Sequence, residues 1–280
     1  MSIKKILIFL YKKLSIIYVF VFGRKSMQFF NDIVLSLSLN AKGFKNYGNF
    51  NLTGEKKFIK LIGEEINLSI DIGANIGKYT KLLLTETNSE VIAFEPLPKA
   101  FEELEEIERN FSSRLKIYNI GIGNKKSNLE LNYSSEKSEK ASFIEDLDKL
   151  SFIDSKNNKK IIVEVITLDS FFKKYDQTYK EKEIDLLKID TEGFELEVLN
   201  GSSETLINKK PKFIQIEFNW HQLFKEQTIY KFSKILSNYE VFKILPFGNS
   251  LIKIDPKRPE SNIFHLSNFV FIRKDISKNY

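Results

Sequence analysis

Two apolar segments of the sequence end in side chains that can accept a proton or bind a cation. The run LLKI is followed by Asp190 and Glu192, and the segment FIQIEFNWH contains Glu217 and His221. Two carboxylates in one site either raise a pKa or bind a cation. Imidazole titrates near neutral pH, so His221 is a candidate general base. Glu217 lies in an apolar run and needs a partner there, for which a metal, a substrate or Lys188 qualifies.

A purely structural interpretation of these residues stays open. Asp190 could cap the helix that follows it, and Glu192 and Glu195 would then favour the positive end of that helix. His221 could be an ordinary surface residue. These structural roles do not exclude the chemical ones.

A glycine turn gathers a second group of polar residues. The segment DIGANIG runs from Asp71 to Gly77, and Glu95 ends the next apolar run about twenty residues later, where a carboxylate can accept hydrogen bonds from ribose hydroxyls. Gly73 permits a sharp turn, and Gly77 lets the following helix approach the strand or the ligand. A dinucleotide site needs a further glycine where Asn75 stands. Since the acidic Asp71 suits a cationic ligand, the turn predicts S-adenosylmethionine, although a turn without a ligand would use similar residues.

Composition excludes several classes of site. The 280 residues include no cysteine, which excludes disulfides, cysteine metal sites and a cysteine nucleophile. The two histidines, His221 and His265, are too few for a multi-histidine zinc site. The net charge of +6 comes with lysines interleaved with acids, which indicates a solvated surface, and we expect no nucleic-acid partner. The sequence makes no prediction of oligomeric state.

Apolar runs and helical patterns alternate along the chain and must position these residues. The pattern predicts strands at 67–73, 90–96, 115–123, 184–193, 212–219, 240–246 and 268–274, the last of them antiparallel, and helices at 77–87, 98–111, 194–209 and 228–238. The region 124–167 reads as hairpin-like strands with a mobile loop at DSKNNKK. Strands separated by helices predict a mostly parallel sheet that binds ligands at the carboxyl ends of its strands. Ile120 would then flank an adenine.

Five motifs, in this order, resemble the FkbM family of S-adenosylmethionine-dependent methyltransferases. They are DIGANIGKYT, VIAFEPLP, TLDSFF, IDLLKIDTEGFELEVLNG and IQIEFNWH, and the resemblance covers about residues 55–225. KIDTEGFE is the most diagnostic, although Thr191 stands where valine is usual. The resemblance implies an α/β, Rossmann-like class I methyltransferase fold, with a seven-stranded, mostly parallel sheet and helices on both faces.

The resemblance also implies roles for single residues. It places Asp71, Gly73, Asn75 and Gly77 at the methionine part of the cofactor, Glu95 at the ribose, Asp190, Glu192 and Gly193 in the D-x-E-G element, and Glu217 at a late acidic position. We assign Ala74, Tyr79 and Ile120 to the cofactor site as well. Asp190, Glu192 and His221 are the predicted catalytic residues, and Asp190 and Glu217 would hold a divalent cation such as Mg²⁺ if the reaction uses one.

The activity implied by this resemblance is O-methyl transfer to a sugar hydroxyl of a surface polysaccharide or related glycan. Methylation of a small metabolite or a lipid is the alternative, and so is a non-catalytic module that binds S-adenosylmethionine. Because the cofactor is made in the cytoplasm, we expect the protein there or at the inner face of the cytoplasmic membrane.

Residues 1–54 are predicted to be a helical lead-in to a methyltransferase domain at 55–280. The N-terminal segment is basic and apolar, but Lys12 and Lys13 interrupt the apolar run, which is too short to span a bilayer. It could pack on the domain. It could also lie on a membrane surface, with Lys4, Lys5, Lys12, Lys13, Arg24 and Lys25 at the headgroups and Phe9, Tyr18, Phe20 and Phe22 inserted.

Overall fold

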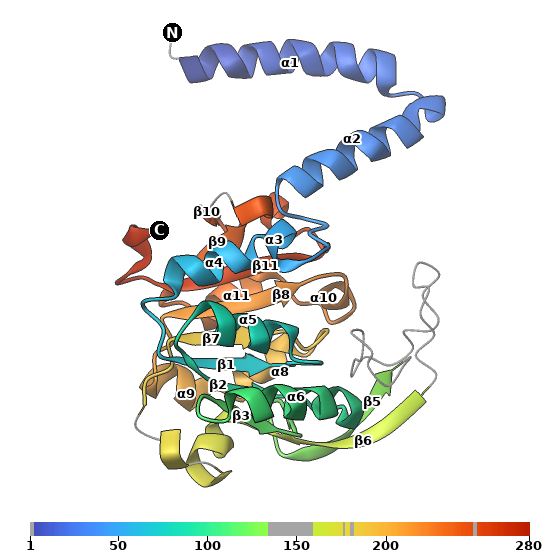
Figure 1. Cartoon of the computed structure of the whole chain (residues 1–280). Coiled ribbons are helices and arrows are strands. Elements are labelled where there is room, and N and C mark those ends of the chain that lie inside the picture. The colour runs from blue at the N-terminus through green and yellow to red at the C-terminus, as the bar shows by residue number, and fades with distance from the viewer. Residues whose placement is uncertain (1–2, 134–158, 176, 180–181, 249–250) are drawn as a thin grey trace.

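An eight-stranded sheet forms the centre of the protein (Figure 1). The computed structural model describes residues 3–133, 159–175, 177–179, 182–248 and 251–280. Most of the predicted mobile loop at DSKNNKK lies outside these residues. The strand order is β10-β9-β11-β8-β7-β1-β2-β3. The strands are β1 Leu68–Ile72, β2 Glu90–Phe94, β3 Leu115–Tyr118, β7 Leu186–Ile189, β8 Phe213–Phe218, β9 Tyr239–Ile244, β10 Leu251–Lys253 and β11 Ser267–Arg273.

The pairing confirms a mostly parallel sheet with an antiparallel last strand. Strands β3, β2, β1, β7 and β8 pair in parallel, and β11 lies antiparallel between β8 and β9. The predicted number of seven strands is wrong by one. The chain turns back after β9, so that Leu251–Lys253 pairs antiparallel with Phe242–Ile244 as the edge strand β10.

A smaller sheet of three strands, in the order β4-β6-β5, lies beside the β3 edge. Its strands are β4 Gly121–Ile122, β5 Ser127–Tyr133 and β6 Lys159–Ile166, and the antiparallel pairing of β5 with β6 confirms the predicted hairpin-like strands. The single strand predicted at 115–123 is wrong, because the chain leaves the large sheet after Tyr118 and joins the smaller one at Gly121.

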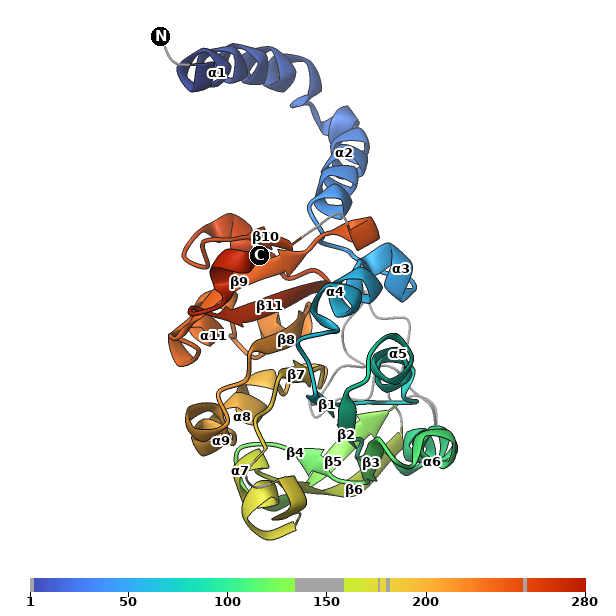
Figure 2. The same ribbon diagram turned by 60° about the vertical axis from the view of Figure 1, so that its left-hand side comes forward.

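Helices cover both faces of the large sheet, as predicted (Figure 2). Helices α4 Glu55–Ile62, α5 Lys78–Glu86 and α6 Pro98–Phe111 bury apolar side chains on one face, and α8 Glu195–Asn200 and α11 Ile229–Ile235 do so on the other. The single helix predicted at 194–209 is two, α8 and α9 Ser203–Asn208. They divide at Gly201, where a Cβ would lie 1.9 Å from the carbonyl oxygen of Gly123.

The face under α4 and α5 carries a row of polar residues. Strand side chains alternate between faces, so Ile70 and Ile72 join the core on the opposite side while Asp71 lies under the helices. Asp71 is in register with Lys188, and Lys188 is in register with Gln215. All three are buried, so the sheet itself brings a polar row together across β1, β7 and β8.

The N-terminal helices α1 Ile3–Phe22 and α2 Gln28–Ala41 project away from the sheet (Figures 1 and 2). None of the described side chains of α1 is buried, so the predicted packing of this helix on the domain is not seen. In the described part of the chain, no helix has the length and apolar character needed to cross a bilayer. Residues 46–53, assigned to the lead-in, lie beside the domain, and the boundary after residue 54 stays a prediction.

Replacement of Gly73 by alanine tests how closely β1 and β7 approach each other. Gly73 has φ +81°, and a Cβ there would lie 1.9 Å from the carbonyl oxygen of Asp190. We expect Gly73→Ala to lower the free energy of unfolding by about 2 kcal/mol or more, because it combines left-handed strain with a backbone clash. Gly63→Ala, at an ordinary helical φ of −58°, is the control and should have a small effect in the same urea titration. Equal stability of the two variants would contradict the close approach.

Candidate active site

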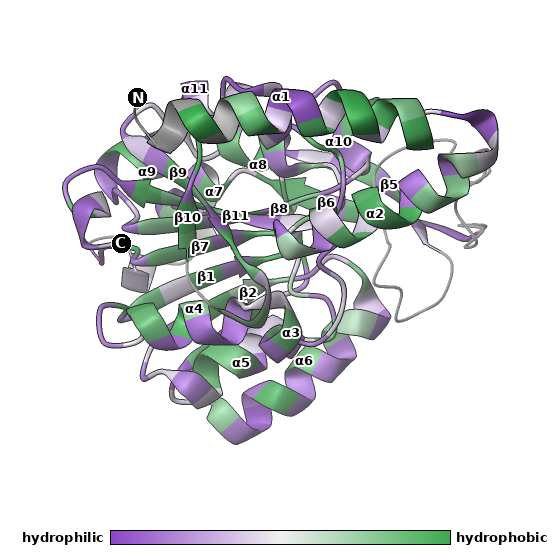
Figure 3. Ribbon diagram, turned by 90° about the horizontal axis from the view of Figure 1, so that it is seen from above, coloured by the Kyte–Doolittle hydropathy of each residue, from purple (hydrophilic) through white to green (hydrophobic). Residues whose placement is uncertain are grey.

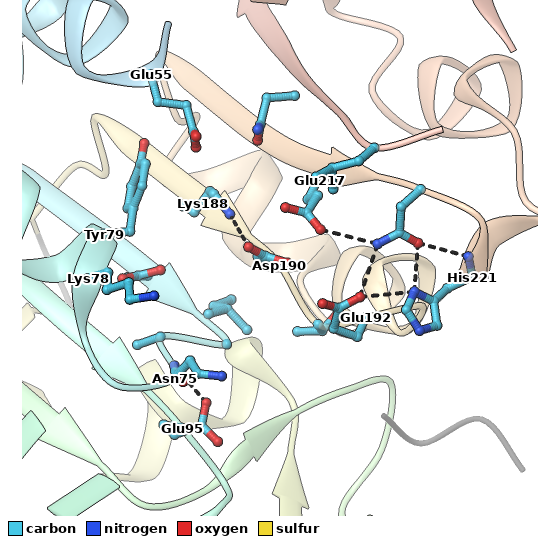
Figure 4. A pocket seen from close by; sticks show the side chains of 18 of the residues that line it. Glu55, Asn75, Lys78, Tyr79, Glu95, Lys188, Asp190, Glu192, Glu217 and His221 are labelled. Atoms are coloured by element: carbon cyan, nitrogen blue, oxygen red, sulfur yellow. Dashed lines mark hydrogen bonds and ion pairs between the residues drawn. The ribbon is translucent and has the colours of Figure 1, made fainter. Parts of the chain in front are cut away.

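A cavity of 1120 Å³ opens at the carboxyl ends of β1, β2, β7 and β8 (Figure 4). The predicted residues that line it are Asp71, Gly73, Ala74, Asn75, Tyr79, Glu95, Ile120, Asp190, Glu192, Glu217 and His221. The sheet topology therefore brings both predicted groups of residues into one space. Their contacts with a cofactor or substrate stay predictions.

Gly77 is the predicted site residue that does not line this cavity. A Cβ at Gly77 would lie 2.4 Å from Ile107 Cδ1 and 2.7 Å from Leu104 Cδ2, both on α6. Its positive φ and missing side chain thus allow α5 to begin against α6. The expectation that Gly77 admits the strand or a ligand is corrected, since the neighbour that needs the space is another helix.

The Glu95 side chain accepts hydrogen bonds from the backbone of the glycine turn and of the residues after β2. One carboxylate oxygen accepts a hydrogen bond from the N–H of Asn75 at 2.8 Å, and the other accepts one from the N–H of Leu97 at 2.8 Å. Asn75 has φ +50°, and its side-chain oxygen accepts the N–H of Ile76. Burial raises the pKa of Glu95 to about 7, against the lowering effect of the two backbone hydrogen bonds. Each carboxylate oxygen keeps a lone pair for a ligand hydroxyl.

Asp71 lies deeper in the same part of the cavity. Its carboxylate accepts a hydrogen bond of 2.6 Å from the Thr80 hydroxyl on α5. Burial raises the pKa of Asp71 to about 6, although the charge of Lys188 lowers it. Tyr79, one residue before Thr80, donates its hydroxyl proton to Gln215 at 2.6 Å, so this predicted cofactor residue is tied to β8.

Lys188 is a buried cation at the centre of the carboxylates. Its Nζ lies 2.8 Å from Asp190 Oδ2 and 5.2 Å from the centre of the Tyr79 ring. Burial alone would lower the pKa of Lys188, but the negative charges of Asp190, Glu217, Glu55 and Asp71 raise it above its ordinary value. The lysine therefore remains charged. Its charge lowers the pKa of Glu217, for which Lys188 was a predicted partner, but its ion pair is with Asp190.

Glu55 is a further carboxylate of this network, and it was not among the predicted site residues. It begins α4, is buried, and accepts hydrogen bonds from Thr53 at 2.7 Å and from Gln215 at 2.9 Å. Gln215 also donates to Asn268 on β11 at 2.9 Å. The sequence shows only an acidic residue at a helix start, so nothing local signals that Glu55 reaches the cavity.

Asn219 orders the carboxylates of Glu192 and Glu217 at the other end of the cavity. Its amide nitrogen donates to Glu192 at 3.0 Å and to Glu217 at 3.1 Å, and its oxygen accepts the backbone N–H of His221 at 2.8 Å (Figure 4). Carboxylate oxygens of Asp190, Glu192 and Glu217 lie within 4.8 Å of one another. Asn219 was not among the predicted site residues, although it lies within the segment IQIEFNWH.

Burial raises the pKa of Glu217 well above its ordinary value, and the charges of Asp190 and Glu192 raise it further. Burial also raises the pKa of the Tyr47 hydroxyl, and the charges of Glu217 and Glu192 raise it further. This end of the cavity thus stabilises protons or cations and disfavours further negative charge.

His221 is buried and lies behind the carboxylates. Its Nδ1 is 2.7 Å from Asn219 Oδ1 and 2.9 Å from Glu192 Oε2. Both neighbours are acceptors, so Nδ1 carries the proton. Nε2 is buried and has no hydrogen-bond partner in the described part of the chain. In this arrangement His221 orients Glu192. Its ring also lines the cavity, and its role as a direct base stays a prediction.

Glu195, and not Asp190, receives the free N–H groups before α8. Its Oε1 accepts the N–H of Thr191 at 2.9 Å and the N–H of Gly193 at 3.1 Å. The alternative in which Asp190 caps this helix is therefore wrong. Asp190 is left to pair with Lys188, and Glu192, at φ +51°, points into the cavity.

Known structures and family sequences resemble this chain. The crystal structure of a methyltransferase FkbM from Methylobacillus flagellatus KT is 17% identical and aligns over 74% of this chain and 44% of its own, with a TM-score of 0.45. This chain thus spans less than half the length of that protein. The Pyrococcus horikoshii TYW2 structure in complex with MeSAdo is 14% identical, over 81% of this chain and 65% of its own, with a TM-score of 0.39. An rRNA methylase from Streptococcus thermophilus is 8% identical, over 78% and 93%, with a TM-score of 0.41.

No curated protein sequence matches the chain significantly. The sequence pattern of the methyltransferase FkbM domain matches residues 71–245, which is more than half of the chain. The family match and the sheet order together confirm the predicted Rossmann-like class I methyltransferase fold. The chain belongs to the FkbM methyltransferase family.

Proposed function

We propose that the protein is an S-adenosylmethionine-dependent O-methyltransferase that acts on a sugar hydroxyl of a surface polysaccharide or related glycan. One observation carries the proposal. A single cavity has the carboxylates of Asp71 and Glu95 at one end and three further carboxylates at the other. When bound, the cofactor would supply a methyl group on a positively charged sulfur.

The residues of the turn fit that cofactor. When ionised, the carboxylates of Asp71 and Glu95 only accept hydrogen bonds. They then suit ribose hydroxyls and an ammonium group, and they repel phosphate. Their raised pKa values mean that the ionised carboxylates are unfavourable at these buried positions, and a cationic ligand would stabilise them. Gly73 and Asn75 shape the backbone between them, and Ile120 lines the side of the cavity where we place the adenine.

The other end suits a polyhydroxylated acceptor. Tyr47 and Trp220 line it, and aromatic faces pack well against the C–H surface of a sugar. The carboxylates can orient neighbouring hydroxyl groups by accepting their hydrogen bonds. We prefer the glycan to a lipid because three carboxylates gather at this end, where they can accept hydrogen bonds from several hydroxyl groups.

Within this proposal Glu192 takes the proton from the attacking hydroxyl. Asn219 and His221 hold its carboxylate, and Lys188 holds Asp190 in place beside it. Deprotonation as the hydroxyl attacks, together with positioning of the two reactants, accounts for catalysis. Asp190 then binds the acceptor, or shares a divalent cation with Glu217.

Comparison of surface glycans tests the acceptor. Cells that lack the gene should lose one methyl ether by mass spectrometry, and wild type should restore it, whereas Asp190→Ala and Glu192→Gln should reduce it at least about a hundredfold, as for loss of a general base. Glu102→Gln on the exposed side of α6 is the matched control and should restore it fully. Unchanged glycans under expressing conditions would move the small-metabolite, lipid and non-catalytic alternatives ahead.

Cofactor affinity should depend on pH through Glu95. The ionised form can accept hydrogen bonds from both ribose hydroxyls, so the proton on a carboxylate of pKa about 7 must leave on binding, and affinity rises with pH. We expect binding at pH 6 to be about tenfold weaker than at pH 8 by calorimetry. Glu95→Gln should weaken binding at pH 8 about tenfold and flatten the profile above pH 6, whereas Glu90→Gln, at the start of the same strand, should not. An unchanged profile in Glu95→Gln would refute this assignment.

Metal removal separates the two catalytic arrangements. If Asp190 and Glu217 share a divalent cation, chelator should abolish methyl transfer, and Mg²⁺ should restore it, because the cation lowers the pKa of the acceptor hydroxyl. The raised pKa of Glu217 favours this outcome, since a cation would offset the crowded negative charge. Full activity of dialysed protein in chelator would instead leave Glu192 to act without a metal.

A further inference from the structure

The two N-terminal helices present apolar side chains to solvent without using them in the fold. In α1, Ile6, Leu10, Leu14, Ile17 and Val21 are all exposed. Their spacing of four, four, three and four residues places them on one face of the helix. Leu14 and Ile17 are 63% and 60% exposed, although burial of such side chains is favourable by about 1.5–3 kcal/mol each.

Helix α2 continues this exposed apolar surface. Phe29, Ile33 and Leu37 follow one another at four-residue intervals, and all three are exposed, Phe29 at 78%. Figure 3 shows long hydrophobic stretches on both helices. The elbow between them is defined by contacts, since the Tyr18 hydroxyl donates to Asn31 at 2.7 Å and the Phe22 and Phe30 rings stack at 5.1 Å. Among the described side chains of the two helices, only Leu39 near the end of α2 is buried in the domain core.

The net positive charge of the protein is concentrated in the same segment. Residues 1–25 contain six basic residues and no acidic one, namely Lys4, Lys5, Lys12, Lys13, Arg24 and Lys25. The whole chain has a net charge of +6, so the remaining residues carry equal numbers of basic and acidic side chains. The surface that fits these helices must therefore be both apolar and negatively charged.

Charge and hydrophobicity together select among the possible partners. A second copy of this chain would place six like charges against six in a symmetric contact, which is unfavourable. Nucleic acid offers negative charge but little for aliphatic stripes to bury against. An anionic bilayer surface offers both, with phosphates at the level of the lysines and acyl chains below them.

We propose that α1 and α2 form a lipid-docking unit, residues 3–41, that lies on an anionic bilayer surface. Lys12, Lys13, Arg24 and Lys25, all exposed, face the headgroups. The apolar stripes of the two helices enter the boundary between headgroups and acyl chains.

Docking would also bring the cavity close to the bilayer. Residues 46–50, which follow α2 after a short connection, line the cavity and include Tyr47 at the acceptor end. The lipid-docking unit thus joins the chain next to the rim of the site. An acceptor attached to the bilayer would meet the cavity close to the surface that holds it.

Co-sedimentation of the full chain with vesicles tests the proposal without any methyl-transfer readout. We expect binding to vesicles of phosphatidylglycerol and phosphatidylethanolamine, and little binding to phosphatidylcholine alone. Neutralising Lys12, Lys13, Arg24 and Lys25 together by glutamine should weaken binding about a hundredfold or more, since each basic residue near the surface contributes about fivefold. Neutralising the exposed Lys125, Lys174, Lys257 and Lys278 is the matched control, with the same change in net charge and little expected effect.

A second variant pair tests the apolar stripe and guards against misfolding. Leu14→Gln with Ile17→Gln should weaken binding to anionic vesicles about tenfold or more while the thermal melting temperature of the domain stays unchanged. Equal binding to anionic and neutral vesicles, or equal loss in the basic variant and its control, would overturn the proposal. So would a stable dimer in solution that fails to bind vesicles and that Leu14→Gln with Ile17→Gln dissociates, because a second copy would then cover the stripe.

Discussion

The candidate site depends on one ion pair, that of the buried Lys188 with the half-buried Asp190. An ammonium group in a protein interior is costly unless charges of the opposite sign surround it, and four carboxylates do so here. The same lysine keeps those carboxylates from repelling one another outright. Removing Lys188 would leave the buried carboxylates around it without their counterion, which is far more costly than losing a surface pair. The chemistry of the cavity and the stability of the central strands therefore rest on the same residues.

Around this ion pair, neutral amides do much of the positioning. Gln215 links Tyr79 on α5 to Glu55 on α4, and Asn219 links Glu217 to Glu192. An amide offers donors and an acceptor without adding charge. The cavity thus keeps its excess of negative charge, which a cationic cofactor would reduce, while each carboxylate has a defined orientation.

Residues near one another in the chain were predictable from the sequence, and residues that meet only through the fold were not. The turn from Asp71 to Asn75 is a local motif, and the alternation of strands and helices placed Asp190 and Glu217 at one edge of the sheet. Glu55 comes from a helix before the first strand, so no spacing connects it with Gln215. The packing of Gly77 against α6 and the burial of His221 likewise depend on tertiary contacts. The strand β10 escaped prediction because its three residues, which pair only at an edge, resemble an ordinary loop.

Glu192 stands in the left-handed region of backbone conformation, at φ +51°, directly before Gly193. For most residues with a Cβ this conformation costs roughly 1 kcal/mol or more. Glycine avoids the cost, and asparagine tolerates the conformation better than glutamate does. The residue that we place closest to the acceptor is thus also a poor choice for the backbone it occupies. Evolution toward greater thermal stability, if freed from the demands of activity, would be expected to discard this glutamate early. A relative with glycine at this position would then have a more stable fold and would lack this activity.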